Sequence, residues 1–177
     1  HPKRSPPGNR NSANTNRRGS STLNMMIRAR DDIAGFASRL TDRDIPPQAR
    51  KLATDAITDC VACALAGSHT DLARHLLKVI GSTSRDAAAL LLGTQRRASM
   101  CDAALYNGAI AHALDYDDIS HPAYSHPSAV LVPAIFAVAE GSRASGADIV
   151  TAFVIGLETF GRLGRALNVM ASRFRGK

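Results

Sequence analysis

The side chains best suited to chemistry in this 177-residue chain are concentrated between residues 107 and 128. Three carboxylates, three imidazoles and two prolines fall within 16 residues: Asp115, Asp117, Asp118, His112, His121, His126, Pro122 and Pro127. Small apolar residues flank this segment on both sides, as is typical of buried helices. Because polar groups cost free energy to bury among apolar helices, the concentration indicates a functional site.

Three interpretations follow from the residue types. In the first, Asp115 orients and His126 moves a proton, since a nearby carboxylate favours the protonated form of an imidazole. In the second, Asp117, Asp118 and His121 bind a divalent metal, although Asp-Asp-x-x-His is a short and unspecific spacing. In the third, the aspartates cap backbone amides and the histidines are hydrogen-bonded loop residues. The residue types leave all three open.

Helices are expected to position this cluster, because apolar residues recur with a helical period on both sides of it. The pattern predicts helices over residues 33–40, 45–66, 71–80, 99–114, 128–142 and 148–169. Pro46 and Pro47 suit a first helical turn, and Gly67 is expected to cap that helix. Residues 87–92 fit either a strand or a helical turn. The predicted fold class is all-α, an irregular multi-helix bundle of six to eight helices.

The two prolines also locate the cluster relative to these helices. They predict that the helix beginning at residue 99 ends near Asp118 and that residues 119–127 form a loop. Loops carried on rigid helices are where functional residues are often found. On a helix, Asp115 and Asp118 would share a face, whereas in a loop all three carboxylates could converge.

Composition limits the function classes. The net charge of +7 comes from residues 1–30, which hold seven basic residues and no acid, so fifteen basic residues balance fifteen acidic ones from Asp31 onward. The body therefore offers no general basic surface to nucleic acid. No apolar run reaches the roughly 20 residues of a membrane-spanning helix. We therefore expect no membrane partner and no nucleic-acid partner.

Residues 1–26 are predicted to be a disordered basic tail, and residues 27–177 a helical domain, because the tail has almost nothing apolar to bury. The tail fits an organelle-targeting peptide, a basic arm, or sequence upstream of a natural start at Met25 or Met26. We favour the last and expect a cytoplasmic protein. The alternative is the mitochondrial matrix, if residues 1–26 are a transit peptide.

The cysteines indicate a reducing compartment rather than a disulfide framework. There are three, Cys60, Cys63 and Cys101, which is an odd and sparse set. Cys60 and Cys63 have the spacing of a redox or zinc half-motif, but they lie in an apolar helical run without a partner pair. They are predicted to be buried core thiols.

Long strings in the chain resemble one protein family. Residues 102–118 read DAALYNGAIAHALDYDD, and residues 126–134 read HPSAVLVPA. Supporting strings are DCVACALAG at 59–67, LGTQRRA at 92–98 and GLETFGRLG at 156–164. On these residues, roughly 34–167 resemble the MmgE/PrpD family, which includes 2-methylcitrate dehydratase and cis-aconitate decarboxylase. The resemblance implies a large helical domain with a smaller α/β lid, usually in a homodimer.

The resemblance also implies a cofactor-free lyase or isomerase acting on small di- or tricarboxylic acids, with no metal. Asp115 matches the family's active-site aspartate, and His126 matches the histidine of its His-Pro-Ser motif, a candidate proton donor. Asp115, Ser120, His121 and Arg162 are the expected substrate contacts. Many members have threonine where Ile119 stands, so Ser120 is the nearest replacement hydroxyl. The loop before His126 is also one residue longer than in the decarboxylase-like pattern.

Taken together, the sequence predicts the N-terminal portion of a 2-methylcitrate dehydratase-like lyase that is incomplete as an enzyme by itself. Carboxylate substrates need several converging cations, and Arg162 and Arg165 are the only nearby candidates, whereas family members continue into a further histidine motif, lysines and the lid. One alternative is a cis-aconitate decarboxylase-like or epimerase/isomerase member of the same family. Another is a non-catalytic helical dimerisation or interaction module.

Overall fold

The computed structural model describes residues 28, 30–80, 88–121 and 124–175, with side chains described up to residue 167. The chain divides into two units between Arg39 and Leu40. In the first unit, residues 30–39 form the helix that the apolar period predicts. The predicted tail over residues 1–26 and the loop over 81–84 lie outside the described residues. The rest of this section concerns the second unit.

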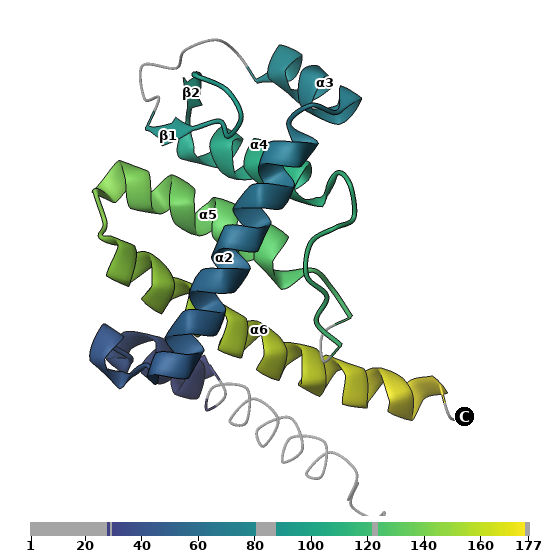
Figure 1. Ribbon diagram of the computed structural model, residues 1–177. Helices are drawn as coiled ribbons and strands as arrows, with labels where there is room; N and C mark the ends of the chain where they lie inside the picture. The colour runs from purple at the N-terminus through teal and green to yellow at the C-terminus, as the bar shows by residue number, and fades with distance from the viewer. Residues whose placement is uncertain (1–27, 29, 81–87, 122–123, 176–177) are drawn as a thin grey trace, which may run out of the picture. The chain divides into compact units, whose positions relative to one another are not determined.

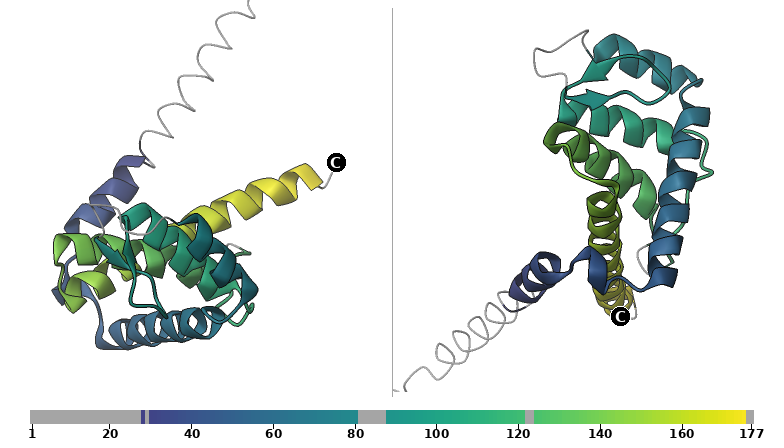
Figure 2. Two further views of the ribbon diagram at one scale, coloured as in Figure 1. Left: turned by 90° about the horizontal axis from the view of Figure 1, so that it is seen from above. Right: turned by 60° about the vertical axis from the view of Figure 1, so that its left-hand side comes forward.

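The helix α2 (Pro47–Gly67) is the long central helix of this unit (Figure 1). It follows a short 3-10 helix, η1 (Asp42–Asp44), and begins at a proline, whose missing N–H costs nothing in a first turn. Figure 2 shows it along one side of α4 and α5, and it also contacts α6. Its buried positions are mostly small, including Ala53, Cys60 and Ala64, so neighbouring helices approach closely.

Gly67 does not cap α2 in the way that the sequence predicts. It is the last helical residue, and Ser68 follows with helical dihedral angles, φ −63° and ψ −16°. The reason for glycine is packing rather than a left-handed turn. A Cβ at Gly67 would lie 1.9 Å from the carbonyl oxygen of Ile110 on α4, so only glycine fits between the two backbones.

A two-stranded sheet connects α3 (Asp71–Val79) to α4 (Met100–His112). Strands β1 (Ala89–Leu90) and β2 (Arg97–Ala98) are antiparallel, which resolves the alternatives for residues 87–92 in favour of a strand. The buried Asn107 of α4 ties this segment down: its amide donates to Leu90 O at 2.9 Å and accepts from Leu92 N at 2.8 Å. Segment 88–98 is thereby fixed to the helix that leads into the candidate site.

The remaining helices are α5 (Pro127–Ser142) and α6 (Gly146–Arg175). The helix α5 packs against both α4 and α6, and the core between the helices includes Tyr106, Ile110, Val132 and Phe153. The mostly helical fold class is confirmed, with the small β1–β2 sheet as an addition. No helix in the described part of the chain has both the length and the apolar character required to cross a membrane.

Candidate functional site

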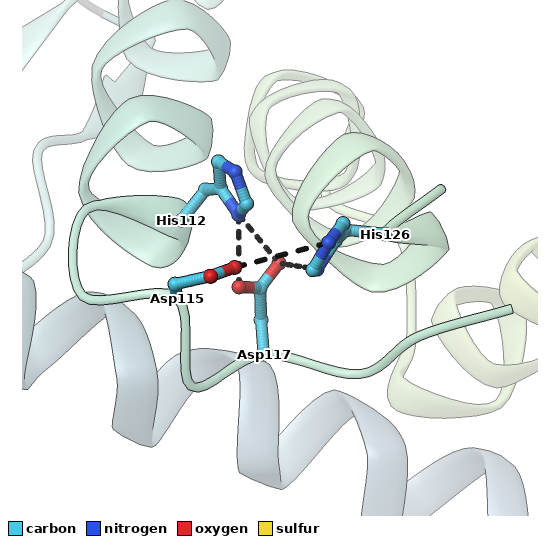
Figure 3. A group of neighbouring side chains, drawn as sticks. All are labelled: His112, Asp115, Asp117 and His126. Atoms are coloured by element: carbon cyan, nitrogen blue, oxygen red, sulfur yellow. Dashed lines mark hydrogen bonds and ion pairs between the residues drawn. The ribbon is translucent and has the colours of Figure 1, made fainter. Parts of the chain in front are cut away.

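The ends of two packed helices carry the candidate site. The helix α4 ends at His112. The prolines predicted an end near Asp118, which is six residues further along the chain. Asp115 follows with a positive φ of 56°, a conformation that aspartate tolerates better than most residues. The loop then returns to His126, the residue that precedes Pro127 and caps α5. Figure 3 shows the two helix ends holding His112 and His126 on either side of the two loop aspartates.

Asp117 is the central member of this cluster. Its side chain is fully buried and faces both imidazoles. Its Oδ1 lies 2.9 Å from His112 Nδ1, and its Oδ2 lies 3.2 Å from the same nitrogen. The two imidazole rings are also in contact, with centroids 4.5 Å apart. A single buried carboxylate therefore holds two histidines from different helices side by side.

His126 is placed between Asp117 and Asp115. Its Nδ1 lies 3.3 Å from Asp117 Oδ2, which is within ion-pair range, but the ring is not oriented for a hydrogen bond. This buried nitrogen consequently has no hydrogen-bond partner among the described residues. Its Nε2 lies 3.8 Å from Asp115 Oδ1, on a side chain that is 77% exposed. Asp117 thus faces the inner nitrogen of the ring, and Asp115 faces the outer one.

The carboxylates alter the proton affinity of His112. The hydrogen bond with Asp117 raises the pKa of His112 above its ordinary value of 6.5; burial opposes this effect, and the charges of Asp117 and Asp115 add to it. In its protonated form, His112 donates from Nδ1 to Asp117. The imidazolium form is therefore stabilised at a pH where a free histidine would be mostly neutral. That property suits a group that gives up a proton near neutral pH.

Two contacts shape the loop that leads to His126. Asp118 Oδ1 accepts a hydrogen bond from Ser128 N at 3.1 Å, and Oδ2 accepts one from Ser128 Oγ at 2.7 Å. Asp118 therefore caps the first turn of α5, as the third sequence interpretation allowed for the aspartates. Ser120 N donates to Ser125 O at 2.8 Å, which closes the loop between them. Both contacts hold His126 at the helix end.

His112 and His126 line a groove of about 560 Å³ between α4 and α5. The rest of its lining is mainly apolar and includes Leu72, Leu105 and Val130. Among the described residues that line it, none is lysine or arginine. The groove therefore combines proton-carrying groups at one place with an apolar surface, and its lining supplies no lysine or arginine for a substrate carboxylate.

The structure brings some of the predicted site residues together. Asp115 and His126 meet as the first interpretation requires. Ser120 is engaged in the loop bridge, and His121 is exposed. Arg162 lies on α6, where its Nε donates to Glu158 at 2.7 Å, and it does not line the groove. The substrate-contact roles of these residues stay predictions.

The ligand set of the metal interpretation is not assembled. In the described parts of the chain, the group whose donor atoms could hold one ion is His112, Asp115, Asp117 and His126, all within 4.8 Å of one another. Asp118 and His121 are outside that group, because the carboxylate of Asp118 is used by Ser128. The sequence interpretations named no proton-transfer or metal-binding role for His112, and they treated Asp117 as a metal ligand or as a cap for backbone amides. The sequence signal that could have pointed to His112 was its position, since it precedes Asp115 by only three residues.

The thiols are structural, as predicted for Cys60 and Cys63. Both are buried and unpaired in α2, whereas Cys101 is exposed. Burial, followed by the nearby charge of Asp118, raises the pKa of Cys60 to about 12. A thiol with so high a pKa stays protonated and is a poor nucleophile or metal ligand near neutral pH.

Comparisons with known proteins identify the family to which the chain is similar. The family model of the MmgE/PrpD N-terminal domain matches residues 31–175. The chain is 33% identical over 143 residues to the cis-aconitate decarboxylase-like protein oryM of Aspergillus oryzae, covering 77% of the chain and 30% of that protein. It is 29% identical over 141 residues to cis-aconitate decarboxylase of Aspergillus terreus, and this match covers 77% of the chain and 29% of that protein. The chain is 40% identical over 79 residues to the human cis-aconitate decarboxylase, and this match covers 41% of the chain and 16% of that protein. The chain thus spans about 30% of the length of the two fungal relatives.

Proposed function

Because this chain belongs to the MmgE/PrpD family, we propose that it forms the helical wall of the active site of a lyase for small di- or tricarboxylic acids. The observation that carries the proposal is the buried Asp117, which holds His112 and His126 together beside the groove. The names of the relatives favour decarboxylation of cis-aconitate. Dehydration of 2-methylcitrate is the alternative.

The two reactions ask different things of the histidines. In decarboxylation, a carbon–carbon bond breaks, CO2 leaves, and the electron pair that remains on the substrate takes up one proton. One proton donor is sufficient, and His126 is the proposed donor; its outer nitrogen faces Asp115, which supports this role. Dehydration also needs a base to remove a proton from carbon, while an acid protonates the departing hydroxyl. His112 is the second imidazole available for it.

The charge of the substrate demands more than this cluster supplies. Carboxylates bind through charge-assisted hydrogen bonds, most often from arginine or lysine. The groove lining has neither, and the cluster itself contains two carboxylates. We therefore propose that basic side chains from outside the described residues bind the substrate carboxylates. The share of the fungal relatives that this chain spans is consistent with that requirement.

The experiment incubates the full 177-residue chain with cis-aconitate or with 2-methylcitrate and follows CO2 release and alkene formation by NMR. If turnover is seen, His126→Gln should lower the rate by about 10²- to 10⁴-fold, the usual contribution of a positioned proton donor. His75→Gln is the matched control, because His75 is an exposed histidine on α3 that belongs neither to the cluster nor to the groove lining.

Binding gives a second measurement when the chain alone shows no turnover. Each acid is titrated while the ring proton resonances of His112 and His126 are followed. A saturable shift at both rings, with the ring of His75 on α3 unaffected, would support the proposed site. The absence of both turnover and a shift at these rings would refute the proposal. A His126→Gln variant with undiminished turnover would also refute it.

A helical dimerisation module is the second candidate function. Exposed apolar side chains favour it: Leu105 and Val130 on the groove are each 59% exposed, and Tyr116 in the loop is 74% exposed. A surface of this kind is often covered by another polypeptide. Light scattering after size exclusion would show a dimer at micromolar concentration if it is correct. A monomer at all concentrations would contradict it.

A further inference from the structure

We propose that His112, Asp115, Asp117 and His126 form a binding site for a divalent transition-metal cation of the zinc class. Each residue offers one ligand atom, a ring nitrogen or a carboxylate oxygen, and these four atoms all lie within 4.8 Å of one another. They come from two helix ends and the loop between them (Figure 3). This inference goes beyond the proposed lyase reaction, and metal binding can be measured whether or not the chain turns over any acid.

The distances between donor atoms suit a four-coordinate ion. Metal–ligand bonds of about 2.1 Å at tetrahedral angles place neighbouring donors about 3.4 Å apart. Asp117 Oδ2 lies 3.2 Å from His112 Nδ1 and 3.3 Å from His126 Nδ1. These donors therefore need to separate only slightly to admit an ion. Asp115 completes the set, because a side chain that is 77% exposed can turn toward the ion without breaking packing.

Burial and charge favour a cation at the same place. A histidine loses its extra proton when it ligates a metal, so the two carboxylates and two neutral imidazoles of the occupied site carry a net charge of −2, which one divalent ion cancels. Asp117 is fully buried, and His126 Nδ1 is a buried nitrogen with no hydrogen-bond partner in the described parts of the chain. Buried charges and unsatisfied polar atoms both cost free energy. A cation bound between them would relieve both costs.

The donor types determine the class of ion. Two imidazoles with carboxylates suit Zn²⁺, Co²⁺ or Ni²⁺, whereas Mg²⁺ and Ca²⁺ prefer oxygen ligands throughout. The ion would occupy a nitrogen lone pair of His126, the residue that moves the proton in the proposed reaction. A bound transition metal is therefore expected to block the lyase site rather than to assist it.

The test titrates the full chain with Co²⁺, whose visible absorption reports coordination number, and then with Zn²⁺ as competitor. We expect one equivalent to bind, with the intense visible bands of a four-coordinate site, reversed by a chelator. His112→Ala and His126→Ala should each weaken binding by at least about 10-fold, because loss of a group that only supports a ligand already costs about 10- to 100-fold. His121→Ala, in the same loop, should bind as the unaltered chain does.

Circular dichroism checks that each variant is folded. If an alanine variant does not fold, paramagnetic broadening by Co²⁺ in the unaltered chain replaces it: selective broadening of the His112 and His126 ring resonances supports the site. Absence of saturable binding, broadening elsewhere, or equal affinity in all variants would overturn the proposal. A thiolate-to-cobalt charge-transfer band would also overturn it, because it would place the ion at one of the cysteines, Cys60, Cys63 or Cys101.

Discussion

Replacing Gly67 with alanine should destabilise the protein at the point where α2 meets α4. The added Cβ would lie 1.9 Å from Ile110 O and 2.9 Å from Ile110 C. An ordinary carbon–oxygen contact is about 3.3 Å, so the two backbones would have to separate by more than 1 Å. Neither partner is a flexible side chain that could turn away. Because Ile110 precedes His112 by two residues on α4, the displacement should reach the site.

The size of the effect follows from two opposing terms. Overpacking a well-packed contact costs typically about 1–3 kcal/mol, and a backbone clash belongs at the upper end of that range. Alanine is about 1 kcal/mol better than glycine in a helix, which offsets part of the cost. The net loss should be about 2 kcal/mol. For a domain of this size, that corresponds to a fall of about 8 °C in the melting temperature.

Thermal and urea denaturation would measure this loss, and Gly161→Ala is the matched control. A Cβ at Gly161, on α6, would meet nothing within 4 Å, so that variant should gain up to about 1 kcal/mol from helix propensity alone. The same substitution should therefore have opposite signs at the two positions. A Gly67→Ala melting temperature within about 1 °C of the unaltered chain would refute the packing argument.

Three further predictions concern the site and the core. Asp117→Asn should lower the raised pKa of His112, measured by NMR titration with a chelator present; an unchanged value would show that Asp117 is not the cause. In the unaltered chain, the stability from this contact should be full below pH 6.5 and lost as the pH rises through the folded pKa of His112. Asp118→Ala should cost about 1–3 kcal/mol in urea denaturation, because it leaves the buried donors of Ser128 unpaired, and a loss below about 0.5 kcal/mol would contradict the capping role. Tyr106→Phe should be neutral or slightly stabilising in the same assay, since the buried hydroxyl has no hydrogen-bond partner among the described residues, and a loss above 1 kcal/mol would indicate a partner.

Local rules in the sequence determined where most helices begin and which residues are candidates for chemistry. Proline begins both α2 and α5, and Thr70 caps α3, where its hydroxyl accepts a hydrogen bond from Ala73 N. Each of these signals acts within a few residues of its own position. The apolar period then sets which side of each helix faces the core. The same short-range reasoning identified the segment that holds Asp115 and His126, because reactive side chains concentrated between apolar helices are visible without a structure.

Contacts between distant segments were decided by the tertiary structure. Nothing close to Arg96 in the sequence points to its partners, yet its guanidinium donates to Leu77 O at 3.2 Å and Ile80 O at 3.0 Å, at the end of α3. The sequence predicts Gly67 as a helix cap, yet glycine is required there because the backbone of α4 leaves no room for a Cβ. Neither partner can be inferred from neighbours in sequence, since both depend on how the helices pack.

The candidate site shows the same division. Its three carboxylates are equivalent in sequence terms, being charged, close together and near a proline. Only packing gave them separate environments: Asp115 stays exposed, Asp117 is buried against two imidazoles, and Asp118 caps α5. The sequence therefore determined that proton chemistry could occur in this segment. The crossing of α4 and α5 determined which carboxylate lies between the histidines, because burial and orientation depend on the packing of those two helices.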